Sequence, residues 1–350
     1  THTAHPHVTE DGTVFNLALS TSKKPVYHIV KFPNKPKSDE DDYSMFDKAH
    51  ICATIPSRWK FNPSYMHSFG ISENYFVIIE QPACFSASKV LLSKFLKMTA
   101  LDLFQWYNDT TKFIVVSRKT GDVVETFYSK GFFYFHTINQ YEDSDHIVLD
   151  ICTFKDFSVL YSLYIEEMKN ANNNPNYGNT FHSVPHRFVL PLGKKTSTEN
   201  LVKLPYTTAK AYLANNGDVT VEPELICEVT CELPTIHYDQ LSGKKYQFFY
   251  AFSFCATSIN PGALIKVDVL NKTSLTWYEE GSYPSEPIFV PAPDAQKEDD
   301  GVVLASLIDR KDENCVSLLI LEASTFTEIG RVEFRTPSPV PRTFHGWYFP

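Results

Sequence analysis

The stretch Asn62–Gly70 reads NPSYMHSFG and places a histidine, His67, in an apolar and aromatic run that ends at a glycine. A single histidine in such a run is more commonly a packed core residue than a ligand. The arrangement recurs, however. Phe135–Asn139 (FHTIN) and Thr343–Gly346 (TFHG) repeat it, and Ala4–His7 (AHPH) adds two more histidines. This recurrence favours histidines placed for a function over packing alone.

The spacing of these histidines indicates a repeated structural unit. His67 lies 62 residues after His5, His136 follows after another 69, and His345 lies 209 residues further on, close to three more steps of the same size. A unit of four strands with generous loops, each unit sending one inner strand to a common axis, would produce such steps. The spacing therefore predicts a β-propeller with a metal ion on its axis.

Short β-rich runs bounded by turn residues dominate the chain, which we predict to be all-β. Helical periodicity is confined to Val90–Trp106 and Leu160–Asn170, and the polar stretch Asn170–Gly178 (NANNNPNYG) is expected to be a loop. We expect strands over residues 26–32, 75–80, 113–117, 146–153, 187–192, 246–254, 263–269, 287–290, 302–307, 316–322 and 329–334.

Composition excludes some classes of protein. The 350 residues are 43% hydrophobic, enough for one large domain or two. A net charge of -9 without a long basic run argues against nucleic acid, because phosphate binding needs a basic surface. No apolar run approaches the roughly 20 residues of a membrane span. The chain starts at Thr1 without Met or a signal peptide, and we expect a fragment of a longer protein.

Cysteine usage predicts the compartment. The seven cysteines, at positions 52, 84, 152, 227, 231, 255 and 315, are odd in number and scattered through apolar runs. This pattern is typical of free thiols in a reducing compartment, so we expect a cytoplasmic protein. Cys227 and Cys231 are interpreted as thiols on a strand face and not as zinc ligands.

The run Pro82–Phe104 is apolar and aromatic with three interspersed lysines. Such a segment is typical of a helix that touches a membrane interface peripherally, and equally of a helix packed on its own domain. Both interpretations stay open.

Two carboxylates fall in the long gap between His136 and His345. Glu232 (in CELP) and Glu286 (in YPSEP) each lie in apolar, proline-rich sequence where a free charge would be costly. A buried carboxylate can accept the second ring N–H of a ligand histidine and offset the charge of a metal ion. A structural ion pair or a loop cap is the alternative for each. Four neutral imidazoles suit iron, copper or zinc, and a six-coordinate ion would keep two open positions.

Several motifs resemble, in order and spacing, the animal branch of the carotenoid cleavage oxygenase family over essentially the whole chain. That branch includes the β-carotene oxygenases, the insect carotenoid isomerooxygenase and the retinoid isomerohydrolase of the retinal pigment epithelium. The matching segments are residues 4–7 (AHPH), 12–16 (GTVFN), 63–70 (PSYMHSFG), 80–82 (EQP), 135–143 (FHTINQYED), 232–234 (ELP), 283–290 (YPSEPIFV), 298–303 (EDDGVV) and 344–346 (FHG).

The resemblance implies a seven-bladed β-propeller with a non-haem Fe(II) ion on its axis. The four ligands that it implies are His5, His67, His136 and His345. It also implies three outer glutamates, of which two correspond to Glu232 and Glu286 and the third would lie in a blade N-terminal to Thr1. Residues 1–350 would then form a single domain of about five to six blades, incomplete at the N-terminus, with a helical insertion near residues 86–106.

Some assignments within this site stay open. His5 and His7 point to the same face of a strand, so spacing does not choose between them, whereas the family motif favours His5. In the family a hydrophobic tunnel passes the iron, and the candidates to line it here are Phe135, Phe344, Phe154 and Tyr161. Each could equally be a core residue. The isomerohydrolase carries Trp where this chain has Phe154, which disfavours its chemistry.

The resemblance implies a dioxygenase that adds both atoms of O2 across one double bond of a carotenoid or retinoid substrate and releases aldehydes such as retinal. The insect version would couple cleavage to trans–cis isomerisation. One alternative is an isomerohydrolase in which the iron acts as a Lewis acid on a retinyl ester. Another is a carotenoid or retinoid binder without turnover. We expect a monomer in each case.

Overall fold

The computed structural model describes residues 1–21, 24–34, 44–107, 110–195, 199–254, 262–309 and 311–349, so Cys255 lies outside the described residues. The chain groups into two compact units. Unit 1 comprises Thr1–Leu149 and Phe188–Pro223, and unit 2 comprises Asp150–Arg187 and Glu224–Pro350. The six cysteines that the structure describes are free thiols.

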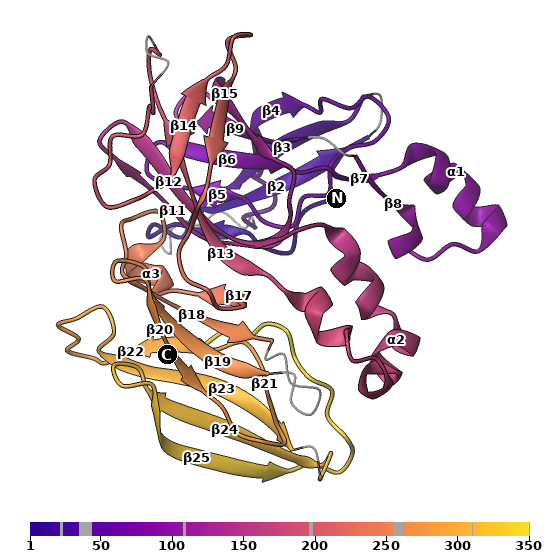
Figure 1. Cartoon of the computed structure of the whole chain (residues 1–350), viewed down its shortest axis with the longest axis vertical. Helices are drawn as coiled ribbons and strands as arrows, with labels where there is room; N and C mark the ends of the chain where they lie inside the picture. The colour runs from indigo at the N-terminus through magenta and orange to yellow at the C-terminus, as the bar shows by residue number, and fades with distance from the viewer. Residues whose placement is uncertain are drawn as a thin grey trace. The chain divides into compact units, whose positions relative to one another are not determined.

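Unit 1 begins with an antiparallel sheet of order β1-β2-β3-β4 (Figure 1). Its strands are β1 (His7–Val8), β2 (Val14–Ser20), β3 (Val26–Phe32) and β4 (His50–Pro56). Alternation along β3 buries Tyr27 and Ile29, which join the core, while the residues between them are only partly covered. This is the period of two expected for a strand with one buried face.

A second sheet of unit 1 has the order β14-β15-β10-β9-β6-β5. Its strands are β5 (Gly70–Ile71), β6 (Tyr75–Glu80), β9 (Thr110–Ser117), β10 (Val123–Lys130), β14 (Lys210–Leu213) and β15 (Val219–Glu222). β15 pairs with β10 in parallel, and the other neighbours are antiparallel. Apolar side chains from both sheets, among them Phe15, Leu17, Phe69, Phe76 and Ile114, form one core cluster.

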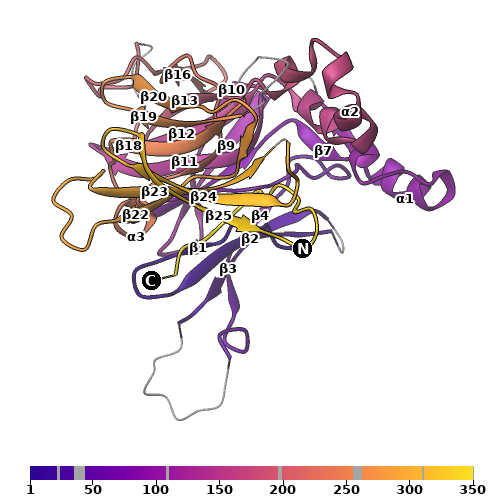
Figure 2. The same ribbon diagram turned by 90° about the horizontal axis from the view of Figure 1, so that it is seen from below.

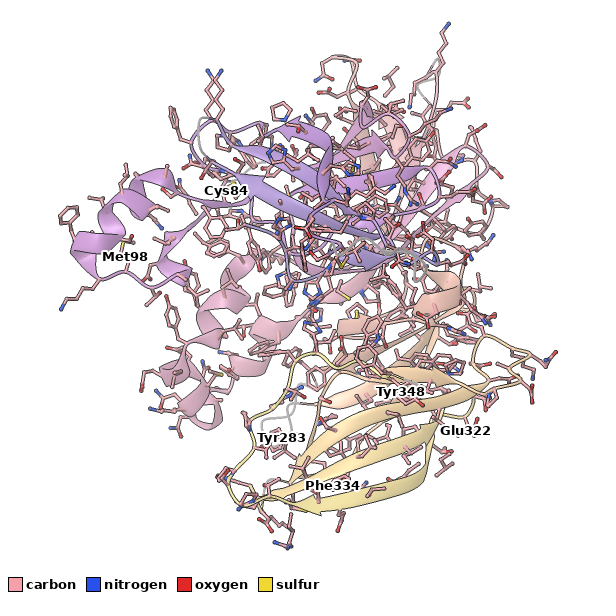
Figure 3. The ribbon with its side chains drawn as sticks, turned by 180° about the vertical axis from the view of Figure 1, so that it is seen from behind. Cys84, Met98, Tyr283, Glu322, Phe334 and Tyr348 are labelled. Carbon is pink, nitrogen blue, oxygen red and sulfur yellow. The ribbon has the colours of Figure 1, made fainter. Side chains whose placement is uncertain are left out.

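The helical segment of unit 1 is shorter than its periodicity predicts. α1 (Ala87–Leu96) ends at Lys97, which is left-handed with φ 49°, and η1 (Leu101–Leu103) follows. β8 (Phe104–Trp106) then pairs with β7 (Ala83–Phe85). The predicted helix over Val90–Trp106 is therefore wrong in its second half, because the ring of Phe104 packs against Phe85 at 4.7 Å in this hairpin. α1 and the turn through Met98 lie beside the β7–β8 hairpin and away from the four-stranded and six-stranded sheets of unit 1 (Figures 1, 2 and 3).

A third sheet has the order β11-β12-β13-β16, and the chain passes from one unit to the other within β12 and β13. Its strands are β11 (Phe133–Asp143), β12 (His146–Phe154), β13 (Val184–Pro191) and β16 (Glu224–Leu225). The turn between β11 and β12 places Ser144 and Asp145 at φ 47° and 60°. Two successive positive φ angles match the right-handed twist of a tight hairpin, and Ser and Asp tolerate them because they are small and polar.

Short helices follow β12 in unit 2. They are η2 (Phe157–Leu163), α2 (Ile165–Lys169), η3 (Ala171–Asn173) and η4 (Tyr177–Phe181). The predicted helix over Leu160–Asn170 is thus divided in two, and the predicted loop Asn170–Gly178 contains turns of 3-10 helix. Among the described residues, no helix combines the length and the apolar character needed to cross a bilayer.

Unit 2 contains two further sheets, of order β17-β18-β19-β20 and β21-β23-β24-β25 with β22 paired to β23. Their strands are β17 (Glu232–Thr235), β18 (Phe248–Ser253), β19 (Ala263–Asp268), β20 (Thr273–Trp277), β21 (Ser282–Pro284), β22 (Ile288–Pro291), β23 (Gly301–Asp309), β24 (Cys315–Glu322) and β25 (Thr327–Arg335). α3 (Tyr238–Leu241) joins β17 to β18. Figure 3 labels Glu322 on β24 and Phe334 on the largely exposed edge strand β25.

The predicted all-β fold is confirmed, and the described residues form five sheets of four or more strands. The six residues that the sequence analysis assigned to the propeller axis can now be placed relative to the strands. His5 precedes β1, His67 precedes β5, His136 lies in β11, Glu232 begins β17, Glu286 separates β21 from β22, and His345 follows β25. His136 lies in the third sheet, and two further sheets, of order β17-β18-β19-β20 and β21-β23-β24-β25, come between that sheet and His345 in the chain.

Candidate metal centre

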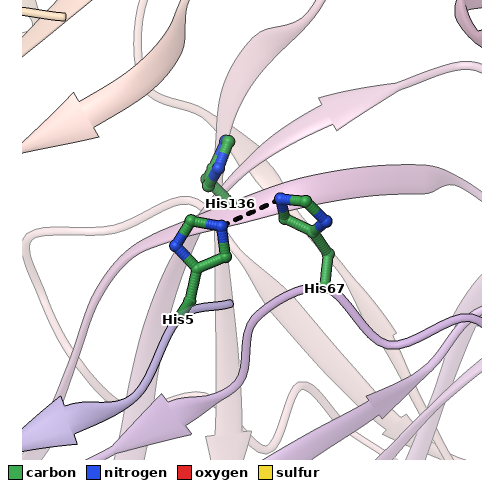
Figure 4. A group of neighbouring side chains, drawn as sticks. All are labelled: His5, His67 and His136. Carbon is green, nitrogen blue, oxygen red and sulfur yellow. Dashed lines mark hydrogen bonds between the residues drawn. The ribbon is translucent and has the colours of Figure 1, made fainter. Parts of the chain in front are cut away.

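Three of the four predicted histidines, His5, His67 and His136, converge in unit 1 (Figure 4). One ring nitrogen from each lies within 4.8 Å of the others. Nε2 of His5 is 2.9 Å from Nε2 of His67, and the ring centroids are 4.6 to 4.9 Å apart. Imidazole nitrogens gathered at this spacing are a donor set that a transition metal can use.

Ser68 joins the segment that carries His67 to the strand that carries His136. Its hydroxyl donates to the carbonyl oxygen of Phe135 (2.8 Å) and accepts from the backbone N–H of Thr137 (3.0 Å). The two partners flank His136 in β11. One buried serine therefore fixes the two ligand candidates relative to each other.

Gly70, which closes the segment, permits a close approach to β11. A Cβ atom at this position would lie 2.0 Å from Oε1 of Gln140. Gln140 is 1% exposed and donates through Nε2 to Ser72 Oγ (2.9 Å) and to the carbonyl of Tyr75 (3.1 Å), so it has little freedom to move away. The glycine after the His67 motif is thus required by packing.

The structure separates His5 from His7. His5 faces the cluster, whereas Nε2 of His7 donates to the carbonyl oxygen of Phe69 at 2.9 Å and its ring lies edge-on to the Phe69 ring at 4.7 Å. Desolvation lowers the pKa of His7 to about 4, so its imidazole is neutral at pH 7. This neutral ring is committed to a backbone carbonyl, and the cluster contains His5 instead.

His345 belongs to unit 2, where Glu286 holds it. Oε1 of Glu286 accepts from Nδ1 of His345 at 2.9 Å, and Oε2 accepts from the backbone N–H of Gly346 at 2.9 Å. The hydrogen bond that His345 donates to Glu286 raises the pKa of His345, and the negative charge of Glu232 acts in the same direction. Glu286 thus fixes the His345 ring through Nδ1 and holds the backbone of the following residue.

Glu232 is buried at the start of β17, with 5% of its surface exposed. Its Oε2 accepts from the backbone N–H of Leu233 at 2.9 Å, and Leu233 is left-handed with φ 53°. The preceding residue, Cys231, places its sulfur 3.5 Å from that of Cys152. Glu232 thus lies in a packed setting, close enough to His345 to influence its pKa.

The four aromatic candidates have different surroundings. Phe135 lies edge-on to His67, with ring centroids 5.1 Å apart, and next to His136 in the chain. Phe154 is buried in β12 of unit 2. Tyr161 is 48% exposed and Phe344 is 68% exposed. Of the four, Phe135 is the one that belongs to the same unit as the histidine cluster and contacts it.

Tyr65 is a site residue that the sequence did not single out, although it lies in the opening motif. Its phenol oxygen is in hydrogen-bond contact with Nδ1 of His67. Its position could have revealed it: in an extended segment, side chains two residues apart lie on the same side, and Tyr65 is two residues before His67.

The donors of the cluster fit a metal ion. They are neutral imidazoles, which suit iron, copper and zinc, and Nε2 of both His5 and His67 is directed into the cluster. Nδ1 of His67 is in contact with the Tyr65 hydroxyl, and Nε2 of the same ring faces Nε2 of His5.

The family profile described as retinal pigment epithelial membrane protein matches residues 1–350. The chain belongs to this family. The resemblance to carotenoid cleavage oxygenases that the motifs indicate is thereby confirmed, because named members of that group are among its relatives. The carotenoid isomerooxygenase of Drosophila melanogaster is 36% identical over 418 residues, covering 100% of this chain and 66% of that protein. The human β,β-carotene 15,15'-dioxygenase is 35% identical over 339 residues, covering 94% of this chain and 61% of that protein.

This family member spans less than two thirds of the length of either relative. Among solved structures, a cobalt-substituted Synechocystis apocarotenoid oxygenase superposes with a TM-score of 0.70 at 20% identity, covering 98% of this chain and 65% of that one. The likeness concerns the fold, which is the β-propeller of these oxygenases.

Proposed function

We propose that this chain is part of an Fe(II)-dependent enzyme that cleaves a carotenoid double bond with O2 to give retinal or related apocarotenal aldehydes. The observation that carries the proposal is the cluster of His5, His67 and His136, whose ring nitrogens lie within 4.8 Å of one another in a chain of this family. The names of the fly and human relatives support the substrate class. The fly relative's name also supports coupled trans–cis isomerisation.

In this proposal His5, His67, His136 and His345 hold the iron. The cobalt-substituted relative supports a metal centre in this fold. When bound, the iron would keep open positions at which dioxygen or a substrate oxygen can be polarised. No general acid, base or nucleophile from the chain is required, since cleavage transfers both oxygen atoms to the substrate carbons.

Two glutamates of the chain are proposed to orient a ligand histidine and to offset the positive charge of the metal ion. Glu286 fixes the ring of His345 through Nδ1 and contributes a negative charge. Glu232, which is also buried in unit 2, adds to that charge. Four neutral imidazoles leave the full charge of a divalent ion, so carboxylates outside the ligand set offset it.

Phe135 is proposed to contact the polyene next to the metal centre. Its ring packs edge-on against Phe133 at 4.8 Å and against His67 at 5.1 Å, which fixes an apolar face beside the ligands. An aromatic face of this kind holds an extended hydrocarbon chain without supplying polar groups that would compete for the iron. Phe154, Phe344 and Tyr161 are assigned to the same tunnel by the family resemblance.

The test uses the full-length protein loaded with Fe(II) and given all-trans β-carotene with and without O2. Products are separated by chromatography against retinal isomer standards. Retinal formed only with O2 would support the dioxygenase, and its isomer would show whether isomerisation is coupled. If no retinal forms, the same protein is given a retinyl ester. Retinol released without O2 would then replace the proposal with an isomerohydrolase, and bound but unchanged carotenoid would indicate a binder. His67→Ala is the matched control and should lose both iron and activity.

We further propose that the protein is a cytoplasmic monomer that touches membranes through α1 to collect its lipid. Leu91, Phe95 and Leu96 on this helix are 74%, 83% and 63% exposed. Lys89 anchors the helix to the hairpin by donating to the carbonyl of Phe104 at 2.7 Å. Burying such a side chain in the interface would contribute about 1.5–3 kcal/mol each.

Vesicle co-sedimentation tests this contact. The double variant Leu91→Glu, Phe95→Glu should reduce the fraction of full-length protein bound to phosphatidylcholine–phosphatidylserine vesicles at least tenfold. Ile329→Glu, which alters an apolar residue 58% exposed on β25, is the matched control and should bind as the unmodified protein does. Equal loss in both variants would argue against α1 as the contact.

A further inference from the structure

We propose that Cys152 and Cys231 form a redox-modification site, at which hydrogen peroxide converts the two thiols into a reversible disulfide. Their sulfur atoms are 3.5 Å apart in unit 2, and both side chains are fully buried. The inference concerns thiol chemistry alone and does not depend on a metal ion. It assigns a reaction to two side chains that the proposed function leaves unused.

Two segments that are distant in the sequence bring the thiols together. Cys152 lies in β12, and Cys231 immediately precedes β17. The backbone N–H of Cys231 donates to the carbonyl oxygen of Ser183 at 2.9 Å. Ser183 leads directly into β13, which is the neighbour of β12 in its sheet. The main chain therefore holds Cys231 beside the sheet that carries Cys152.

The distance between the two sulfur atoms is that of a non-covalent contact. A disulfide bond is about 2.05 Å long, so the sulfur atoms must approach by about 1.5 Å. Small rotations about the Cα–Cβ bonds can supply a movement of this size. Cysteines whose side chains point apart would instead need the backbone to move.

The oxidation balances in two steps. One sulfur, as its thiolate, attacks the O–O bond of hydrogen peroxide: a sulfur–oxygen bond forms, and the hydroxide that leaves takes up the thiol proton to become water. The second sulfur then attacks the sulfenic sulfur, the S–S bond forms, and the sulfur–oxygen bond breaks to release a second water. The two thiols lose two electrons, and the peroxide is reduced to two molecules of water.

Burial makes the first step slow and the second step fast. Desolvation raises the pKa of the Cys152 thiol well above its ordinary value, so this thiol is protonated at neutral pH. Because the thiolate is the reactive form, attack on peroxide needs a transient local opening of unit 2. The partner thiol is already in contact, however, so it captures the sulfenic acid before further oxidation to the irreversible sulfinic acid. The pair thereby keeps oxidation of this core reversible.

The experiment treats the folded full-length protein with hydrogen peroxide, in the presence of a chelator that keeps iron from decomposing the oxidant. Free thiols are then blocked, and disulfide-linked peptides are identified by mass spectrometry. We expect the peptides of Cys152 and Cys231 to be linked to each other, and dithiothreitol should restore both thiols. The same treatment in urea should give a mixture of pairings among the seven cysteines, because only the fold holds these two in contact.

Serine variants test the capture step. Without its partner, the cysteine that reacts with peroxide is open to further oxidation. Either Cys152 in Cys231→Ser or Cys231 in Cys152→Ser should therefore accumulate sulfinic acid that dithiothreitol does not reverse. Cys315→Ser is the matched control, because Cys315 is another free cysteine of unit 2, and this variant should form the Cys152–Cys231 link as the parent does. Circular dichroism before the treatment verifies that each variant is folded.

The outcomes decide the inference without reference to catalysis. A Cys152–Cys231 link in the folded parent and in Cys315→Ser, with sulfinic acid in one of the other two variants, would support the site. The inference is overturned if the folded parent keeps both thiols, if either thiol is linked instead to another cysteine such as Cys227, if the unfolded chain forms the link equally well, or if neither partner variant accumulates sulfinic acid. Because no readout requires a bound metal ion or a carotenoid, each of these results would leave the proposed function standing.

Discussion

Replacing Asp150 with Asn should destabilise the protein more than any conservative change at its surface. Asp150 is fully buried in unit 2 and accepts hydrogen bonds from Nε of Arg187 on Oδ1 (2.9 Å) and from Nη2 of Arg187 on Oδ2 (2.8 Å). The hydroxyl of Tyr246 also donates to Oδ2, at 2.6 Å. Arg187 is 1% exposed, so its charge is neutralised within the protein and not by water.

The magnitude follows from this geometry. Asp150→Asn leaves the buried guanidinium without a counter-charge and turns one acceptor into a donor that faces other donors. Breaking a buried pair in this way costs about 3–5 kcal/mol, a large share of a typical stability of roughly 5–15 kcal/mol. Tyr246→Phe removes one hydrogen bond to a charged group and should cost about 1.5–3 kcal/mol.

Urea unfolding of the full-length protein, followed by circular dichroism, measures both changes from the midpoints and slopes. In the double variant the two losses should not add, because the Tyr246 hydroxyl has already lost its anionic acceptor. The reasoning would be refuted by a loss below about 1 kcal/mol in Asp150→Asn, since a buried charge without a partner cannot be that cheap, or by strict additivity in the double variant.

Four further outcomes are expected. Gly70→Ala should cost about 1–3 kcal/mol in urea unfolding because its Cβ would overlap a buried, hydrogen-bonded glutamine. Arg331 donates to Glu279 and lowers its pKa, so this pair stabilises the fold above the ordinary glutamate pKa and loses its effect as pH falls through the lowered value. Glu279→Gln should therefore cost up to about 1 kcal/mol at pH 7, and this cost should diminish as the pH falls through the lowered pKa of Glu279. In metal-content assays of the full-length protein, His5→Ala should lose the metal whereas His7→Ala should keep it. Chelation should lower the thermal midpoint of the full-length protein, and Fe(II) should restore it, because a metal bound to the native state stabilises it.

Strands were predictable from the sequence where one apolar face or run had clear ends. Val26–Phe32 and Tyr75–Glu80 have the same bounds in the structure as in the sequence prediction. β11 was not among the predicted strands, although it carries His136. Its buried Asn139 and Gln140 interrupt the apolar pattern, and Nε2 of Gln140 donates to Ser72 and to the carbonyl of Tyr75, partners that are distant in sequence.

The helical segments show the opposite limit. The periodicity of Val90–Trp106 continues past the end of α1, but Phe104 lies in β8, where it pairs with Phe85 and packs its ring against the Phe85 ring at 4.7 Å. Tertiary packing of this kind overrides local propensity and is invisible in a window of sequence. The exposure of Tyr161 and Phe344 could not be predicted either. The position of an aromatic residue next to a motif does not reveal whether its ring faces the core or the solvent.

At the candidate metal site, the spacing of the sequence selected the histidines but did not choose between His5 and His7. The hydrogen bonds of the structure distinguish these two residues. His5 and His7 share strand parity, so the alternation of side chains treats them alike. The carbonyl of Phe69 breaks this equivalence by accepting from His7 at 2.9 Å. Phe69 belongs to the same segment as His67, so one short stretch both engages His7 and supplies a ligand candidate. An insertion or deletion within Asn62–Gly70 should consequently disturb both features together, because it would move the Phe69 carbonyl and the His67 ring at the same time.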